Sequence, residues 1–313
     1  MPRRPANTER TRRATVVVLT CLLVAATAGA QDLGHKLPGV IGLDAARIPE
    51  PGLYVVDRVV DYSADELRDR AGREIPIDDL QLRGLANGVG VSYTTRFSQT
   101  VSLTLTAAAP VAHLSLNIHD RPEASFDRFG LTDFYIQPLR LGWRGQRFDA
   151  VASYAFYLPS GKSPLAGGQG LSSGQITHQW AGGGSLFKDQ SRRVFLTALG
   201  SYDLNLRKSG IDITRGDTFQ VQGGAGVSRI RQVLELGVAA CALWQVRDDH
   251  GADVPALIRG ARDRVFGVGP EVAVVLKPIQ SQLRVRYEWD MGVRSRPQGR
   301  IFVVGFTYQV SRP

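Results

Sequence analysis

The chain consists largely of segments in which apolar and polar residues alternate one by one. Successive side chains of a β-strand point to opposite faces, so a period of two predicts strands with one apolar and one polar face. Residues 281–290 show the pattern most clearly, since Leu283, Val285, Tyr287 and Trp289 alternate there with Gln282, Arg284, Arg286, Glu288 and Asp290. Strands are predicted at residues 52–62, 82–96, 100–112, 133–144, 147–158, 179–187, 193–206, 217–229, 232–246, 264–277, 280–291 and 300–310.

The links between these segments alternate between short and long. The short links follow the even-numbered segments, at residues 97–99, 145–146, 188–192, 230–231 and 278–279. The long links follow the odd-numbered segments, at residues 63–81, 113–132, 159–178, 207–216, 247–263 and 292–299. Outer-membrane barrels combine short periplasmic turns with long external loops, whereas a soluble sandwich has no reason to do so. The predicted fold class is all-β: a transmembrane up-and-down antiparallel β-barrel of about 12 strands, with apolar faces toward lipid.

Two of the long links carry patterns of their own. Ser63-Ala64-Asp65-Glu66, followed by Gly72, has the form of a capping box and predicts one or two helical turns. The link 159–178 is rich in Gly and Ser and is expected to be mobile.

The first 30 residues have the three parts of a secretory signal peptide. Arginines precede an apolar run, 14–26, and the small residues Ala28-Gly29-Ala30 follow it, which predicts cleavage after Ala30. The run is shorter than the roughly 20 residues that a membrane-spanning helix needs. Residues 31–51 are expected to form an irregular N-terminal leader, either a short plug or a periplasmic tail, and residues 52–313 the barrel. We expect the mature protein in the bacterial outer membrane, with membrane lipid and lipopolysaccharide as partners.

Composition and motifs exclude several classes of function. The formal net charge is +9, but residues 1–30 account for +4 of it and the other basic residues are scattered among acids, so no nucleic-acid partner is expected. Cys241 is the one cysteine left after cleavage, which rules out an internal disulfide, and it is predicted to pack inward. The sequence contains no zinc-binding spacing, phosphate-binding loop or Gly-x-Ser-x-Gly elbow. We therefore expect no metal, no cofactor and no enzyme.

The polar strand faces supply the candidate lumen residues. They are Arg284, Arg286, Glu288, Asp290, Glu271, Gln220, Gln222 and Asp203. One interpretation is an ion-pair network that fills a narrow barrel, and it is favoured because twelve strands leave little room inside. The other is a polar constriction through which solutes pass. The two interpretations are compatible.

Two alternative functions stay open at this point. Asp248-Asp249-His250, at the outer end of a predicted strand, could activate water in an outer-membrane hydrolase, although charged loop tips are usually only solvated surface. His119-Asp120 is a weaker candidate of the same kind. A barrel with a closed, packed lumen could instead serve adhesion or envelope structure.

Four short stretches together resemble a known family. They are Pro49-Glu50-Pro51-Gly52-Leu53-Tyr54, the run 130–143 that contains Gly130-Leu131-Thr132-Asp133-Phe134 and Gln137-Pro138-Leu139-Arg140-Leu141-Gly142-Trp143, then Leu158-Pro159-Ser160-Gly161, and Val265-Phe266-Gly267-Val268-Gly269-Pro270-Glu271. The chain is similar in these stretches to outer-membrane proteins assigned to the MetA pathway of phenol degradation. The resemblance implies an outer-membrane channel for passive uptake of small hydrophobic or aromatic compounds.

Overall fold

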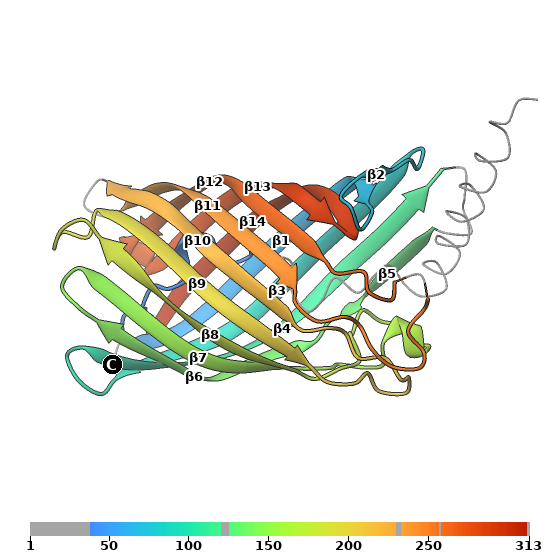
Figure 1. Cartoon of the computed structure of the whole chain (residues 1–313). Coiled ribbons are helices and arrows are strands. Elements are labelled where there is room, and N and C mark those ends of the chain that lie inside the picture. The colour runs from blue at the N-terminus through green and yellow to red at the C-terminus, as the bar shows by residue number, and fades with distance from the viewer. Residues whose placement is uncertain (1–37, 120–124, 230–232, 257, 312–313) are drawn as a thin grey trace, which may run out of the picture.

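The computed structural model describes residues 38–119, 125–229, 233–256 and 258–311, and they form a closed antiparallel β-barrel (Figure 1). Twelve long strands pair in the order β14-β13-β12-β11-β10-β9-β8-β7-β6-β4-β3-β1, and β1 pairs with β14 to close the ring. Their bounds are β1 (Gly52–Arg68), β3 (Leu80–Arg96), β4 (Val101–Ile118), β6 (Phe134–Arg144), β7 (Phe148–Leu158), β8 (Thr177–Phe187), β9 (Val194–Asn205), β10 (Thr218–Arg229), β11 (Leu234–Gln245), β12 (Arg264–Leu276), β13 (Ser281–Arg294) and β14 (Arg296–Ser311). The predicted fold class is confirmed.

The two ends of the barrel differ as the link lengths predicted. The turn end carries the short links 97–100, 145–147 and 277–280, together with the paired residues Leu53 and Ser311 at the limits of the barrel. The loop end carries the long links 159–176, 206–217 and 246–263. The loop end also has two short strands, β2 (Glu74–Ile75), which pairs with β1, and β5 (Phe126–Leu131), which extends the pairing of β4 beyond β6.

Two predictions about the loop end are wrong. The helical turns expected after Ser63 do not form, because β1 continues to Arg68 and pairs there with β14. Pairing with a neighbouring strand thus overrides a local capping signal. The link expected at 292–299 is instead a tight turn at Ser295, whose φ of 55° lets β13 run directly into β14.

The barrel is taller on one side than on the other. Strands β14, β1, β3 and β4 are 16 to 18 residues long, whereas β6 to β11 have 11 or 12. The loop after β7 leans over the opening and is held by a buried carboxylate. Asp133 accepts hydrogen bonds from the Ser172 hydroxyl (2.6 Å) and the Ser173 amide (3.1 Å). The mobility expected from the Gly and Ser content of this loop is therefore opposed by specific hydrogen bonds.

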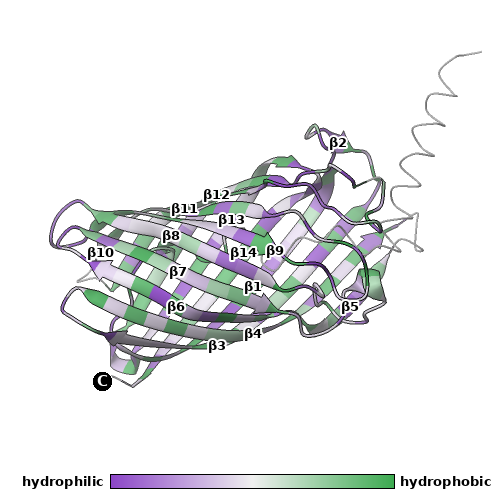
Figure 2. Ribbon diagram, turned by 60° about the horizontal axis from the view of Figure 1, so that its bottom comes forward, coloured by the Kyte–Doolittle hydropathy of each residue, from purple (hydrophilic) through white to green (hydrophobic). Residues whose placement is uncertain are grey.

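Hydrophobic and hydrophilic residues alternate along the strands (Figure 2), and many large apolar side chains are exposed on the outer face of the barrel. Leu105, Val238, Leu283 and Trp289 are examples of apolar side chains exposed there. A polar exception is the pair Asp57 and Asn87 on adjacent strands, joined by a hydrogen bond of 2.6 Å.

The helices of the described residues are single 3-10 turns, namely η1 (Gly42–Asp44), η3 (Pro164–Ala166) and η4 (Lys277–Ile279). No helix in this part of the chain is long and apolar enough to cross a membrane. The predicted signal peptide lies outside the described residues, and its cleavage after Ala30 stays a prediction.

Candidate functional site

The leader, here residues 38–51, lies inside the barrel rather than below it. At the turn end, Glu50 forms ion pairs with Arg144 and Arg96, both at 2.5 Å. From there the leader climbs the lumen to Gly39, where an added Cβ would overlap the carboxylate of Glu288 on β13. The sequence left two placements open for the leader, a plug inside the barrel or a periplasmic tail, and in the structure residues 38–51 form a plug.

Apolar contacts seat the leader against one side of the lumen. Leu43 is fully buried and packs on Phe187 and Phe195. The inner positions opposite it are Gly224 and Gly237, and a Cβ at either would overlap the Leu43 side chain. Glycine in β10 and β11 thus provides the space that the leader fills. Ala45 and Ala46, also fully buried, pack in a second cluster with Val151 and Leu199.

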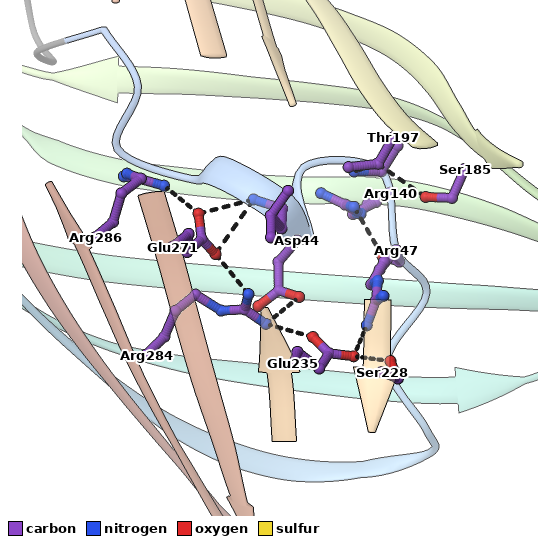
Figure 3. Close-up of polar contacts among 12 residues, drawn as sticks. Asp44, Arg47, Arg140, Ser185, Thr197, Ser228, Glu235, Glu271, Arg284 and Arg286 are labelled. Atoms are coloured by element: carbon purple, nitrogen blue, oxygen red, sulfur yellow. Dashed lines mark hydrogen bonds and ion pairs between the residues drawn. The ribbon is translucent and has the colours of Figure 1, made fainter. Parts of the chain in front are cut away.

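Charged side chains on the inner faces of β11, β12 and β13 hold the leader (Figure 3). We call this surface the charged wall: Glu235, Glu271, Arg284, Arg286 and Glu288. Glu271 lies at its centre, because its carboxylate accepts the Leu43 amide (3.1 Å) and pairs with Arg284 (2.5 Å) and Arg286 (3.1 Å). Arg284 also pairs with Asp44 of η1 at 2.7 Å. The leader therefore adds a carboxylate and a backbone donor to the network.

Other strands complete the hold on the leader backbone. An Nη atom of Arg140 on β6 donates to the carbonyl oxygens of Ala45 (3.1 Å) and Arg47 (3.0 Å). The Arg47 guanidinium pairs with Glu235 at 2.5 Å. The Ile41 amide donates to Gln222 (3.2 Å) on β10. The leader is thus bound by residues from several sides of the barrel.

The candidate lumen residues from the sequence fall into three places. Arg284, Arg286, Glu288 and Glu271 meet in the charged wall, and Gln222 joins them through the leader. Asp290 lies nearer the loop end and accepts from the Tyr62 hydroxyl at 3.0 Å. Asp203 accepts from Gln179 at 2.6 Å on another side of the lumen, and the buried side-chain amide of Gln220 makes no hydrogen bond within the described residues. The expected ion-pair network exists, while a role in permeation stays a prediction.

A large apolar chamber occupies the lumen between the leader and the loop end. Its volume is about 1230 Å³. The inner faces of β1, β3 and β4 form its long side, which we call the apolar wall: Val60, Leu82, Ala86, Ala112, Leu114 and Leu116. Loop residues such as Leu165, Ile213 and Ile258 cover it from the loop end. A space of this size and lining suits an apolar solute.

The floor of the chamber is polar and was missed by sequence reasoning. It includes Arg58, Arg140, Gln137 and Gln179. Arg58 was missed because Asp57 and Arg58 are neighbours on β1, so one had to point inward and the other outward. Valines stand on both sides of this pair, so the pattern does not show which of the two faces the lumen. Only the pairing register of β1 with its neighbouring strands decides that Arg58 faces the lumen.

The rim residues considered for hydrolysis do not come together as a catalytic group. Asp248 pairs with Arg262 at 2.6 Å, and Asp249 accepts from the Gly216 amide at 2.8 Å. The backbone of His250 forms a bridge with Thr214. Each therefore has a structural role in the loops, and Asp120 of the weaker candidate lies outside the described residues. Among all the residues that the structure describes, no group of three or more His, Cys, Asp or Glu side chains could hold a metal ion.

Cys241 is buried on the inner face of β11, as predicted. Its thiol lies 3.5 Å from the carboxylate of Glu288. The cysteine thus packs against the charged wall.

Comparisons with known proteins agree with this architecture. Residues 64–306 match the family described as "Putative MetA-pathway of phenol degradation". An outer membrane channel from Pseudomonas putida F1 superposes with a TM-score of 0.72 at 12% identity, covering 85% of this chain and 97% of that one. The β domain of the Bordetella autotransporter BrkA gives a TM-score of 0.47 at 10% identity, with 82% and 99% covered. The CymD monoaromatic hydrocarbon channel gives 0.44 at 9% identity, with 92% and 97% covered. No curated protein matches the sequence.

Proposed function

The chain belongs to the family described as "Putative MetA-pathway of phenol degradation", and from this premise we propose that it is an outer-membrane channel for passive uptake of small hydrophobic, in particular aromatic, compounds. The apolar chamber is the observation that carries this proposal. Removing apolar surface from water contributes roughly 25 cal/mol per Å², so a chamber lined by the apolar wall concentrates apolar solutes. The Pseudomonas putida protein of the same fold is described as a channel, which supports the proposal.

The arrangement sets a two-stage path through the lumen. A solute enters the chamber from the loop end, and the leader stands between the chamber and the turn end. A crevice beside the leader, lined by Asp44, Arg58 and Arg284 among others, has a volume of about 20 Å³. That is space for about one water molecule. Passage of an aromatic ring down the lumen therefore requires the leader to shift within its seat.

The location follows from the same proposal. Residues 1–30 serve as a signal peptide that is removed after Ala30, and residues 52–313 span the outer membrane as one domain. The loop end faces outward toward lipopolysaccharide and the turn end faces the periplasm, as in other outer-membrane barrels. No covalent chemistry, cofactor or nucleic-acid partner is part of this function.

Uptake by cells with and without the protein tests the proposal. The decisive variant is Ala112→Trp, which places an indole in the chamber from the apolar wall. Its matched control is Ala109→Trp on the outer face of the same strand, where the side chain is exposed. We expect the protein to raise uptake of an aromatic hydrocarbon such as toluene, and Ala112→Trp to remove most of that gain.

The control variant should keep the uptake of the natural chain. Uptake that is the same with and without the protein, for toluene and for longer apolar solutes, would contradict the proposed function. Equal uptake by Ala112→Trp and Ala109→Trp would show that solutes do not use the chamber.

A further inference from the structure

Arg58 stands on the floor of the chamber without a partner of its own. Among the residues that the structure describes, its guanidinium makes no hydrogen bond and no ion pair within 4 Å. Its neighbours across β14 and β3 are the glycines Gly305 and Gly88, and beyond Gly305 lies Arg284, which cannot pair with it because both are cations. The guanidinium is therefore accessible from the chamber and has five donors available.

The arginines that hold the leader differ in this respect. Arg47, Arg284 and Arg286 each pair with a carboxylate of the charged wall. Arg140, which also lines the chamber, donates to two carbonyl oxygens of the leader and has no carboxylate partner in the described residues. The chamber floor thus presents two positive charges that nearby acids do not neutralise by contact.

An unpaired charge at the edge of an apolar space is costly, because the space offers the ion little solvation. The same setting strengthens any interaction with an opposite charge that enters. A guanidinium fork matches the geometry of a carboxylate, which it binds through two parallel hydrogen bonds. The feature that is unfavourable in the empty chamber is thus favourable for an anionic ligand.

The apolar wall above Arg58 completes the description of such a ligand. Val60 and Tyr62 follow Arg58 on the inner face of β1, and both line the chamber. At about 3.3 Å per residue, these four positions give roughly 13 Å of inner surface above the guanidinium. A ligand with one anionic end and one apolar body can place the first on the floor and the second along this wall.

We propose that Arg58 binds the carboxylate of an apolar acid whose aromatic or alkyl body lies along the apolar wall. This inference rests on the proposed function, since it names the solute class that the chamber prefers. Arg140 lies on the same floor and adds positive charge, while Arg58 makes the direct contact. The chamber therefore selects apolar carboxylates over neutral and cationic molecules of the same body.

The test compares three probes that share one apolar body, 4-butylbenzoate, 4-butylbenzyl alcohol and 4-butylbenzylammonium. Their binding to the full chain is measured by titration calorimetry in a nonionic detergent at neutral pH. The benzoate can accept two charge-assisted hydrogen bonds that the alcohol cannot, so it is expected to bind roughly 10- to 100-fold more tightly than the alcohol. The ammonium should bind most weakly.

Variants assign the preference to one residue. Arg58→Gln should bring the benzoate to within a few-fold of the alcohol, because it lowers the affinity for the benzoate much more than the affinity for the alcohol. Arg58→Lys should retain a part of the preference, which separates loss of charge from misfolding. Arg83→Gln is the matched control, because Arg83 is an exposed residue on β3 outside the chamber, and it should behave as the natural chain.

The outcomes separate this inference from the proposed function. Equal affinity for benzoate and alcohol in the natural chain would overturn the headgroup assignment and leave the apolar channel standing. A preference that survives Arg58→Gln would overturn the role of Arg58. Failure of all three probes to bind, together with uptake that does not respond to Ala112→Trp, would overturn the channel itself.

Discussion

The charged wall and the apolar wall lie in one lumen and are separated by a single strand, β14, yet they have little in common. The charged wall on β11 to β13 carries buried acids and arginines that bind the leader. The apolar wall on β1, β3 and β4 carries small and aliphatic side chains and borders an open chamber. Both walls show apolar side chains to the outside. The difference teaches that contact with lipid requires apolar side chains all around the outside of a barrel. The polarity of each inner stretch instead matches what that stretch contacts in the lumen.

The contrast also explains why the leader lies where it does. A buried ion-pair network is stable only when every member has a partner. The leader supplies two such partners, the Asp44 carboxylate for Arg284 and the Leu43 amide for Glu271. Near the apolar wall the leader makes apolar contacts, since Val40 packs against the cluster that contains Val60 and Tyr62. The lumen is thus divided into a seat for the leader and a space for solute.

The largest effect is expected from removing the centre of the charged wall. Glu271→Ala leaves Arg284 and Arg286 without their shared carboxylate, in a place where the Glu271 side chain is fully buried. Breaking a buried pair costs about 3–5 kcal/mol. The free energy of unfolding by urea in lipid vesicles measures it. Glu74→Ala, at an exposed position with only a distant ion pair, is the control. A loss below 1 kcal/mol for Glu271→Ala would mean that the wall does not depend on this carboxylate.

A second pair of variants asks whether the walls are alike on their outer faces. Val285→Arg and Leu105→Arg place a charge behind the charged wall and behind the apolar wall, four residues from the turn end of β13 and β4 respectively. An arginine facing lipid costs about 2–4 kcal/mol near the midplane. Both should impair assembly to the same degree, measured as the folded fraction on gels without heating. A large difference between them would show that one of the two faces is not in lipid.

A third variant pushes the leader away from the charged wall. Gly42 has a φ of +61°, and an added Cβ would overlap Arg286 and Glu271. The left-handed backbone costs a non-glycine residue about 1–2 kcal/mol, and the overlap adds displacement of the leader. Gly42→Ala should therefore raise the conductance of single channels in planar bilayers.

Gly167→Ala is matched to it, because Gly167 has a φ of +80° but nothing within 4 Å of an added Cβ. It should lower stability through the left-handed backbone alone, without changing conductance. If both variants conduct equally, the leader is not the barrier in the lumen.

The smallest effect concerns the turn end, where the leader enters. Desolvation raises the pKa of the Glu50 carboxylate, but the Arg144 and Arg96 ion pairs outweigh it and hold the pKa below its usual value. The ionised Glu50 carboxylate stabilises the folded protein fully when the pH is above the unfolded-state pKa of about 4.3. This stabilisation is lost as the pH falls through the lower folded-state pKa. Since the Glu50 side chain is 62% exposed, we expect it to contribute about 0–1 kcal/mol to the free energy of unfolding.

Hydrogen exchange in the leader, corrected for intrinsic rates, should increase between pH 6 and pH 3. In Glu50→Gln, hydrogen exchange in the leader should not show this increase at low pH, because the variant has no carboxylate to protonate at this position. An equal pH dependence in both chains would place the acid-sensitive contact elsewhere.

Much of the fold could be predicted from local sequence, and the candidate site only in part. The strand positions, the closed barrel and the buried state of Arg284, Arg286 and Glu288 follow from alternation along single strands. The helical turns expected after Ser63 failed because a pairing with β14, more than 200 residues away, decided that stretch. The partners of the charged residues were out of reach for the same reason.

The sequence by itself determined the strands, their two faces and the alternation of turns with loops, because each of these depends on residues close together in the chain. Only the tertiary structure decided that the leader fills the lumen, that β1, β3 and β4 enclose an apolar chamber, and that Arg58 faces it unpaired. Closing the barrel brings Asp44 to Arg284, 240 residues further on, and such contacts depend on strand register and closure. No local pattern encodes them.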